Sequence, residues 1–330
     1  MVNEKFRVGS MELVSRIVMP PMATAKSTAD GRVTEDLLAY YRARAKSGRL
    51  GMIITEHSYI SLEGKAKAGQ LSVSRDEDVE GLAALAAAIQ AYGTRAVAQI
   101  NHSGAAALRE VTGLPAVSAS AVGLPEELHM GDPVAPEELS AEGIARITRE
   151  FAEAAGRVKR AGFDGVEIHC AHAYLLNQFY SPITNRRTDA YGGPLKNRLR
   201  FLLEVVAAVR EIVGEDYPVA VRLGGCDYMD GGNTVEDCVA AARMLEAAGV
   251  DLIDLSGGMC RYVLPGHTEA GYFAEMSAAV KAAVSVPVLV TGGVKKAAEA
   301  EELLAAGAAD LIGVGRALLA DADWAEKEMQ

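Results

Sequence analysis

Cysteine is scarce in this chain of 330 residues, and the four that occur are scattered through its second half. None belongs to a Cys-X-X-Cys pair, which argues against a zinc site or an iron–sulfur cluster, so we expect no metal centre. Sparse cysteine fits a reducing compartment, and a cytoplasmic location is therefore expected. The four are Cys170, Cys226, Cys238 and Cys260.

Signals for secretion and membrane insertion are also missing. Residues 1–10 are polar and mixed in character, and no apolar run approaches the length of roughly 20 residues that a membrane helix needs. Basic residues are in the minority, with 33 Lys and Arg against 44 Asp and Glu and a formal net charge of -11. An acidic surface argues against nucleic acid or a membrane as the main partner, but it allows a local basic pocket.

The chain instead contains a repeated alternation of short apolar segments with longer helical ones. This alternation predicts an α/β chain that forms a single (β/α)8 TIM barrel over residues 1–330, with a hairpin at residues 6–13 as a plug beneath it. An open doubly wound sheet is the main alternative, but no Gly-X-Gly-X-X-Gly follows an early strand. The predicted strands cover residues 17–19, 50–55, 96–100, 166–168, 219–223, 252–255, 288–290 and 311–314.

Helices are expected between these strands, with Thr34 and Ser140 as N-caps of two of them. Residues 105–136 have no sustained periodicity and predict a long loop, which on a barrel is usually functional. Reactive groups of such barrels lie at the carboxyl ends of the strands. The predicted helices cover residues 34–45, 76–92, 140–161, 194–213, 234–248, 273–283 and 295–306, and a closing helix contains Trp324.

The most informative stretch covers residues 165–193, where His169, His172 and Tyr174 follow a short apolar strand. A neutral imidazole can donate a hydrogen bond to an anionic group, and a phenol can transfer a proton. Taken alone, the three residues fit a reactive site and a hydrogen-bonded core equally well. The next residues decide between the two readings, because Asn-Arg-Arg at 185–187, Tyr-Gly-Gly at 191–193 and Asn-Arg at 197–198 follow at fixed intervals.

This pattern resembles the Old Yellow Enzyme family of flavin-dependent ene reductases, and the likeness extends over nearly the whole chain. It is closest to the bacterial branch that includes the barrel domain of 2,4-dienoyl-CoA reductases. The resemblance implies FMN as cofactor and reduction of an α,β-unsaturated carbonyl compound, with NADH or NADPH as the electron source. His169 and His172 would hold the carbonyl oxygen, hydride would come from flavin N5, and Tyr174 would protonate the α-carbon.

A phosphate site is predicted after the last two strands. Gly292 and Gly293 follow the seventh strand, and Gly315 and Arg316 follow the eighth. Glycine lets the backbone approach a phosphate, and arginine can pair with it through two hydrogen bonds. The pattern by itself fits either a phosphorylated ligand or two simple turns. With the resemblance, it implies the phosphate of FMN.

The flavin ring needs amide groups at its pyrimidine edge and a positive charge near N1 and O2. Gln99 and Arg222 stand at strand ends that can provide these, although each could also be an ordinary interior group of the barrel. Pro21, Met22 and Ala23 follow the first strand and match family positions that contact the flavin. His57, after the second strand, is a further candidate contact, whereas His102 is expected to be structural.

Ala23 departs from the family, where the matching position is often a Thr or Cys that hydrogen-bonds the flavin. A flavin that is harder to reduce is therefore expected, unless His57 or Thr24 compensates. Two alternative functions remain: an electron-transferring flavoprotein subunit, and a flavin-free barrel enzyme that acts on a phosphorylated substrate. A homo-oligomer or a separate electron-donor protein is a possible partner, and residues 105–136 and 260–272 are expected to shape the substrate pocket.

Overall fold

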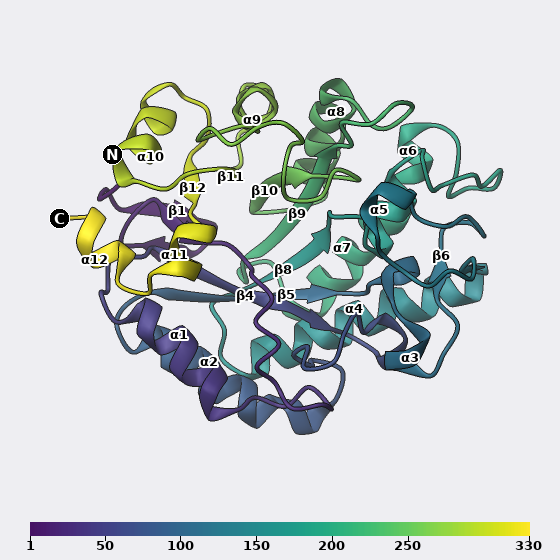
Figure 1. Cartoon of the computed structure of the whole chain (residues 1–330), viewed down its shortest axis with the longest axis horizontal. Helices are drawn as coiled ribbons and strands as arrows, with labels where there is room; N and C mark the ends of the chain where they lie inside the picture. Colours follow the sequence, from purple (N-terminus) through teal and green to yellow (C-terminus); the bar gives the residue numbers. More distant parts are fainter.

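The computed structural model describes residues 1–330 and contains a closed barrel of eight parallel strands (Figure 1). Around the barrel the strand order is β10, β11, β12, β3, β4, β5, β8 and β9. The predicted (β/α)8 barrel is therefore confirmed. The barrel strands are β3 (Ile17–Met19), β4 (Met52–Tyr59), β5 (Arg95–Asn101), β8 (Gly165–Cys170), β9 (Val219–Cys226), β10 (Leu252–Gly257), β11 (Val288–Thr291) and β12 (Leu311–Gly313).

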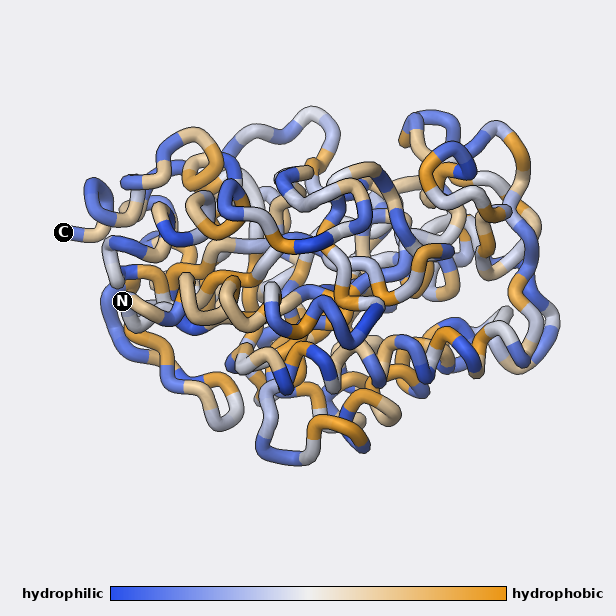
Figure 2. The backbone as a smooth tube through the Cα atoms, turned by 90° about the horizontal axis from the view of Figure 1, so that it is seen from below, coloured by the Kyte–Doolittle hydropathy of each residue, from blue (hydrophilic) through white to orange (hydrophobic).

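Helices surround the barrel, and two of them begin directly after the predicted N-caps. Thr34 and Ser140 each accept a hydrogen bond from a backbone amide three residues later, and Thr234 forms a capping box with Asp237. Polar and apolar residues alternate along the helices in Figure 2. The main helices are α1 (Glu35–Ala45), α2 (Val79–Gln90), α4 (Ala141–Arg160), α7 (Arg200–Val213), α8 (Val235–Ala247), α9 (Ala274–Lys281), α10 (Ala297–Ala305), α11 (Arg316–Ala320) and α12 (Trp324–Glu328).

The amino-terminal hairpin lies at one end of the barrel, as expected. It consists of β1 (Phe6–Val8) and β2 (Met11–Leu13), which pair antiparallel. Val8, Met11 and Leu13 are buried in a separate apolar cluster with interior side chains from every barrel strand except β8. Since these side chains come mostly from the first halves of the strands, the hairpin closes the amino-terminal end of the barrel.

Some boundaries differ from the expectation. The second barrel strand does not end at Thr55 but continues to Tyr59, because a register shift between Thr55 and Ser58 lets Glu56 and His57 enter the strand. A short helix, α5 (Leu175–Tyr180), follows β8 and was not expected. The expected helix over 194–213 is divided at Leu199 into α6 (Leu195–Arg198) and α7.

Residues 105–136 were predicted as a loop, but they contain short regular elements. These are η3 (Gly104–Ala106), α3 (Arg109–Thr112), β6 (Val117–Ser118) and η4 (Glu126–Leu128), and β6 pairs in parallel with β7 (Glu137–Glu138). None is long enough to give a periodic signal in sequence. None of the helices in the structure is both long and apolar enough to cross a lipid bilayer.

Candidate active site

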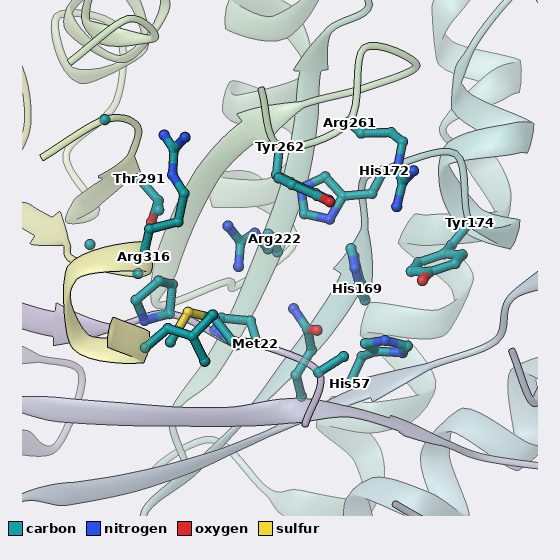
Figure 3. A pocket seen from close by; sticks show the side chains of 18 of the residues that line it. Met22, His57, His169, His172, Tyr174, Arg222, Arg261, Tyr262, Thr291 and Arg316 are labelled. Atoms are coloured by element: carbon teal, nitrogen blue, oxygen red, sulfur yellow. The ribbon is translucent and has the colours of Figure 1, made fainter. Parts of the chain in front are cut away.

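A cavity of about 450 Å³ lies at the carboxyl-terminal end of the barrel (Figure 3). It is lined by residues of β4, β5, β8, β9, β11 and β12 and of the segments that follow β3, β4, β8, β10, β11 and β12. The sequence-predicted residues that line it are Pro21, Met22, Ala23, His57, Gln99, His169, His172, Tyr174, Arg222, Gly293, Gly315 and Arg316. Gly292 does not line the cavity, and a Cβ added to it would lie 3.1 Å from the Tyr272 ring.

A strained turn after β8 places the three residues proposed as catalytic. His172 and Ala173 have φ values of 60° and 63°, in the left-handed region that non-glycine residues rarely occupy. Such strain persists where the surroundings enforce it, and here the Ala173 amide donates to Asn177 Oδ1 at 2.8 Å. As a result, the ring of His169 lies 5.0 Å from that of His172 and 5.2 Å from that of Tyr174, between ring centres.

Burial sets the protonation of these groups. It lowers the pKa of His169 and of His172 well below the usual imidazole value, so both rings are neutral. The Ala171 amide donates to Nδ1 of His169 at 3.2 Å, which leaves the hydrogen of the neutral ring on Nε2. His172 Nε2 lies 2.8 Å from Ser256 Oγ. Burial also raises the pKa of Tyr174 to about 12, so the phenol keeps its proton at neutral pH.

His57 enters the cavity from the irregular part of β4. Its ring centre is 5.2 Å from that of Tyr174, and Gln70 Nε2 donates to its Nδ1 at 2.9 Å. This contact leaves the ring hydrogen on Nε2. Burial, together with the nearby Lys67 ammonium, lowers the pKa of His57 to about 4. The structure thus places a third neutral imidazole beside the proposed catalytic residues.

Gln99 and Arg222 lie above two buried carboxyl groups inside the barrel. Gln99 Nε2 donates to Glu167 Oε1 at 2.8 Å, and Arg222 Nε is 3.3 Å from Asp254 Oδ2 without hydrogen-bond alignment. Burial raises the pKa of Glu167 well above the usual value and that of Asp254 to about 6. Arg222 is therefore close to a buried acid, which agrees with the alternative that it is an ordinary interior group of the barrel. Its Nε and Nη1 nevertheless have no hydrogen-bond partner.

The far end of the cavity fits a phosphate group. Gly293 has a φ of +74°, and an added Cβ there would lie 2.0 Å from the carbonyl oxygen of Glu269. A Cβ on Gly313 would lie 1.9 Å from Thr291 Oγ1, a buried hydroxyl without a partner. Arg316 donates to the Tyr272 hydroxyl at 3.3 Å and points into the same space. Unpaired donors at both ends of one cavity are what an elongated anionic cofactor such as FMN requires.

Other residues of the sequence motif are structural. Arg187 pairs with Asp189 and donates to the carbonyl oxygens of Ala119 and Leu139. Asn185 and Arg198 likewise bind backbone carbonyls, and none of these side chains lines the cavity. His102 is also outside it, where its Nδ1 accepts from the Gly104 amide.

Several lining residues were not predicted. Lys67 comes from the loop after β4, and Arg261, Tyr262 and Tyr272 come from the segment after β10. That segment, residues 260–272, was expected to shape the pocket, but no local pattern identified which side chains point inward. The only available signal was their position after a barrel strand.

A closed barrel with neutral imidazoles, a protonated tyrosine and a glycine-lined end beside Arg316 fits the class of flavin-dependent oxidoreductases of the Old Yellow Enzyme type. The chain belongs to the NADH:flavin oxidoreductase / NADH oxidase family, whose sequence profile matches residues 4–330. Membership in this family implies FMN as the cofactor and a nicotinamide nucleotide as the electron donor.

Two relatives and one solved structure illustrate the similarity. The chain is 40% identical to an NADH oxidase of Thermoanaerobacter brockii over 327 residues, which are 97% of the chain and 49% of that protein. It is 37% identical to an NADPH dehydrogenase of Bacillus subtilis over 319 residues, 95% and 90% of the two chains. An Old Yellow Enzyme homologue from Zymomonas mobilis superposes with a TM-score of 0.84 at 27% identity, covering 99% of this chain and 91% of the other.

The lengths of these relatives differ. The chain spans about half of the Thermoanaerobacter NADH oxidase and 48% of a metal reductase of Desulforamulus reducens, but most of the NADPH dehydrogenase. Membership in a flavin family removes the flavin-free barrel enzyme from the alternatives considered above.

Proposed function

We propose that the protein is an ene reductase, which reduces the C=C bond of an α,β-unsaturated carbonyl compound. The observation that carries the proposal is the arrangement of His169, His172 and Tyr174 around one cavity, with both imidazoles neutral and the phenol protonated. FMN, the cofactor that the family implies, would supply the hydride-transfer chemistry when bound, with NADH or NADPH as the source of electrons.

The two imidazoles would bind the carbonyl oxygen of the acceptor. Nε2 of His169 carries a hydrogen that no protein group accepts, and His172 stands at right angles to it, 5.0 Å away. Neutral donors polarise the carbonyl group and stabilise the negative charge that develops on its oxygen when the β-carbon gains hydride. Because the rings stay neutral over the physiological range, this function would not depend on protonation of either histidine.

Tyr174 would supply the proton for the α-carbon. Its ring centre is 5.2 Å from that of His169, so a carbonyl compound held by the imidazoles extends toward the phenol. A phenol of pKa about 12 is a weak acid toward a neutral ketone, but it can protonate the far more basic carbon of an enolate. The phenolate would recover its proton from solvent at the mouth of the cavity.

The test separates the two half-reactions in the stopped-flow instrument. Replacing Tyr174 with Phe removes the proton and keeps the ring, so we expect re-oxidation of the reduced enzyme by 2-cyclohexenone to slow by about 10²- to 10⁴-fold. Reduction of the flavin by NADPH or NADH should change little.

Tyr92→Phe, at an exposed tyrosine after α2, is the control and should affect neither half-reaction. An equal loss in both half-reactions of Tyr174→Phe would argue against the phenol as acid. If the wild-type enzyme oxidises NAD(P)H but no enone re-oxidises its flavin, the protein passes electrons to another acceptor, which is the alternative function.

A further inference from the structure

The active-site cavity is positively charged although the chain is acidic. Four cationic side chains line it, and no aspartate or glutamate does, in a protein with a formal net charge of -11. Arg222 and Arg316 lie on the side assigned to the flavin, between the pyrimidine edge and the phosphate cradle. Two cations, Arg261 and Lys67, are left without a role in binding FMN.

Arg261 has no anionic partner in the protein. It takes part in no ion pair and no side-chain hydrogen bond, and its buried Nε lacks a hydrogen-bond partner. Its guanidinium lies 5.1 Å from the centre of the Tyr262 ring, a contact that supplies no negative charge. Two other half-buried arginines of this chain have acidic partners, Arg146 with Glu63 at 2.7 Å and Arg210 with Asp251 at 2.8 Å. A partly desolvated guanidinium is costly without a counter-charge, so its position calls for an anion from outside.

The backbone holds Arg261 in this position. Its φ of 63° lies in the left-handed region, and its amide donates to the Gly258 carbonyl at 3.0 Å. Gly257 allows the close approach, because a Cβ there would lie 2.1 Å from the Arg261 carbonyl oxygen. An arginine that lines a cavity with a strained backbone conformation indicates a role in binding.

The direction of Arg261 indicates where the anion would be. Figure 3 shows its guanidinium group beside the His172 ring, on the side of Tyr174. In the proposed reaction these residues contact the carbonyl oxygen and the α-carbon, so an anion on Arg261 belongs to the carbonyl side of the double bond. Lys67 lines the cavity on the side of His57, where it forms no direct ion pair, although its charge also acts on the buried Glu56.

We propose that Arg261 binds a carboxylate on the carbonyl side of the acceptor, with Lys67 adding a second positive charge, so that the substrate is an unsaturated oxo acid rather than a neutral enone. This inference rests on the proposed ene reduction. The carboxylate takes no part in bond changes: the β-carbon gains hydride from the NAD(P)H-reduced enzyme, the α-carbon gains the Tyr174 proton, and the C=C bond becomes a single bond. A carboxylate is the natural ligand because a planar guanidinium can hold both of its oxygens.

The experiment compares an acid with its neutral ester in the FMN-loaded enzyme. (E)-2-oxo-4-phenylbut-3-enoate carries its carboxylate on the carbonyl carbon, and its methyl ester has the same carbon skeleton without the charge. We expect the wild type to prefer the acid, and the ratio of kcat/KM for acid over ester to fall about 10- to 100-fold in Arg261→Gln. Lys67→Gln should lower the same ratio less, and Arg261→Lys should restore part of it.

Binding without turnover gives an independent measurement. The saturated 2-oxo-4-phenylbutanoate cannot be reduced at a C=C bond, and its affinity for the oxidised enzyme can be measured by calorimetry. Its preference over the saturated ester should fall in Arg261→Gln by about the same factor. Arg149→Gln, at an exposed and unpaired arginine of α4, makes the same chemical change away from the cavity and should leave both ratios unchanged.

Three results would overturn the inference. The first is a wild type that prefers the ester, and the second is an acid-to-ester ratio that Arg261→Gln does not change. The third is a variant that loses affinity for NADH or NADPH in flavin reduction while the ratio stays constant, which would assign the cations to the dinucleotide phosphates. If the wild type reduces neither acid nor ester, the ene-reductase proposal fails instead, and calorimetry still decides whether Arg261 binds the carboxylate.

Discussion

Ala23 is the residue at which this site differs most from what its family implies. It lines the cavity but has no polar side-chain atom. The adjacent Thr24 cannot replace a missing hydroxyl, because its Oγ1 donates to Glu56 Oε2 at 2.6 Å. His57 keeps one free ring N–H and is the only one of the two expected substitutes still available.

Introducing a hydroxyl at this position should make the flavin easier to reduce. A hydrogen bond to a charged state is worth about 1.5–3 kcal/mol, which for a two-electron couple is roughly 30–60 mV. We therefore expect Ala23→Thr to raise the reduction potential by that amount, as measured by equilibration with redox dyes. Ala23→Val has the shape of threonine without its hydroxyl and is the control. A potential in Ala23→Thr no higher than in Ala23→Val would show that this hydrogen bond does not form.

Glu56, which holds Thr24, is a second unusual residue. Its side chain is buried, and burial raises its pKa from 4.5 to about 7 in spite of the hydrogen bonds from Thr24. In the unfolded chain the pKa is the ordinary value. Between pH 4.5 and 7 the folded protein thus binds more protons than the unfolded one, and this group makes stability fall as pH rises through that window.

Glu56→Gln should remove this dependence on pH. Between pH 5 and pH 8, the free energy of unfolding of the wild type should decrease by roughly 3 kcal/mol more than that of the variant. Urea unfolding of both proteins at the two pH values measures the difference. The pKa of His57 is lowered to about 4, so protonation of this group on acidification destabilises the fold. Both proteins contain His57, so its contribution cancels in the comparison. Parallel stability curves would mean that Glu56 is ionised in the folded state.

At the scale of elements, the turn after β11 (Val288–Thr291) should be sensitive to a single methyl group. Gly293 and Gly307 have similar φ values of +74° and +70°, but an added Cβ lies 2.0 Å from the Glu269 carbonyl oxygen at Gly293 and meets nothing within 4 Å at Gly307. Alanine at either site should cost about 1 kcal/mol or more of stability, because both must keep a left-handed backbone.

Only Gly293→Ala must also displace the backbone of the proposed phosphate site, so we expect the dissociation constant of this variant for FMN to rise about tenfold or more. Fluorescence titration of flavin-free protein with FMN measures this constant. Gly307→Ala should bind FMN like the wild type. Equal FMN affinities in the two variants would place the phosphate elsewhere in the cavity.

Secondary-structure elements could be predicted from the sequence where the periodicity was strong. Contacts between residues that are distant in the sequence could not be predicted. The barrel followed from repeated strand–helix alternation, and the strand-end rule placed His169, Gln99 and Arg222 at the cavity. The continuation of β4 past Thr55 was missed because its polar residues interrupt the apolar run. Arg261 was missed because its loop is directed by contacts with distant residues, such as the hydrogen bond from the Cys260 amide to the Asp227 carbonyl.

The whole molecule combines an acidic exterior with a basic interior cavity. The chain has a formal net charge of -11, whereas four cationic side chains and no aspartate or glutamate line the cavity. A cleft of one sign raises the local concentration of oppositely charged ligands and selects among them. FMN, the nicotinamide dinucleotides and the proposed oxo acid are all anions, so the positive charge of the cavity attracts each of them. Discrimination among them must come from individual ion pairs, such as the one proposed for Arg261.

The hairpin formed by β1 and β2 has a kinetic consequence. Because it fills the opposite end of the barrel, the cavity at the carboxyl-terminal end is the site that dinucleotide and acceptor would share, and we expect them to occupy it in turn. Oxidised dinucleotide therefore has to depart before the second reactant can enter. Initial rates measured at varied concentrations of both reactants should give parallel lines in double-reciprocal plots. An excess of either reactant should inhibit, because the dinucleotide would then bind the reduced enzyme and the acceptor the oxidised enzyme.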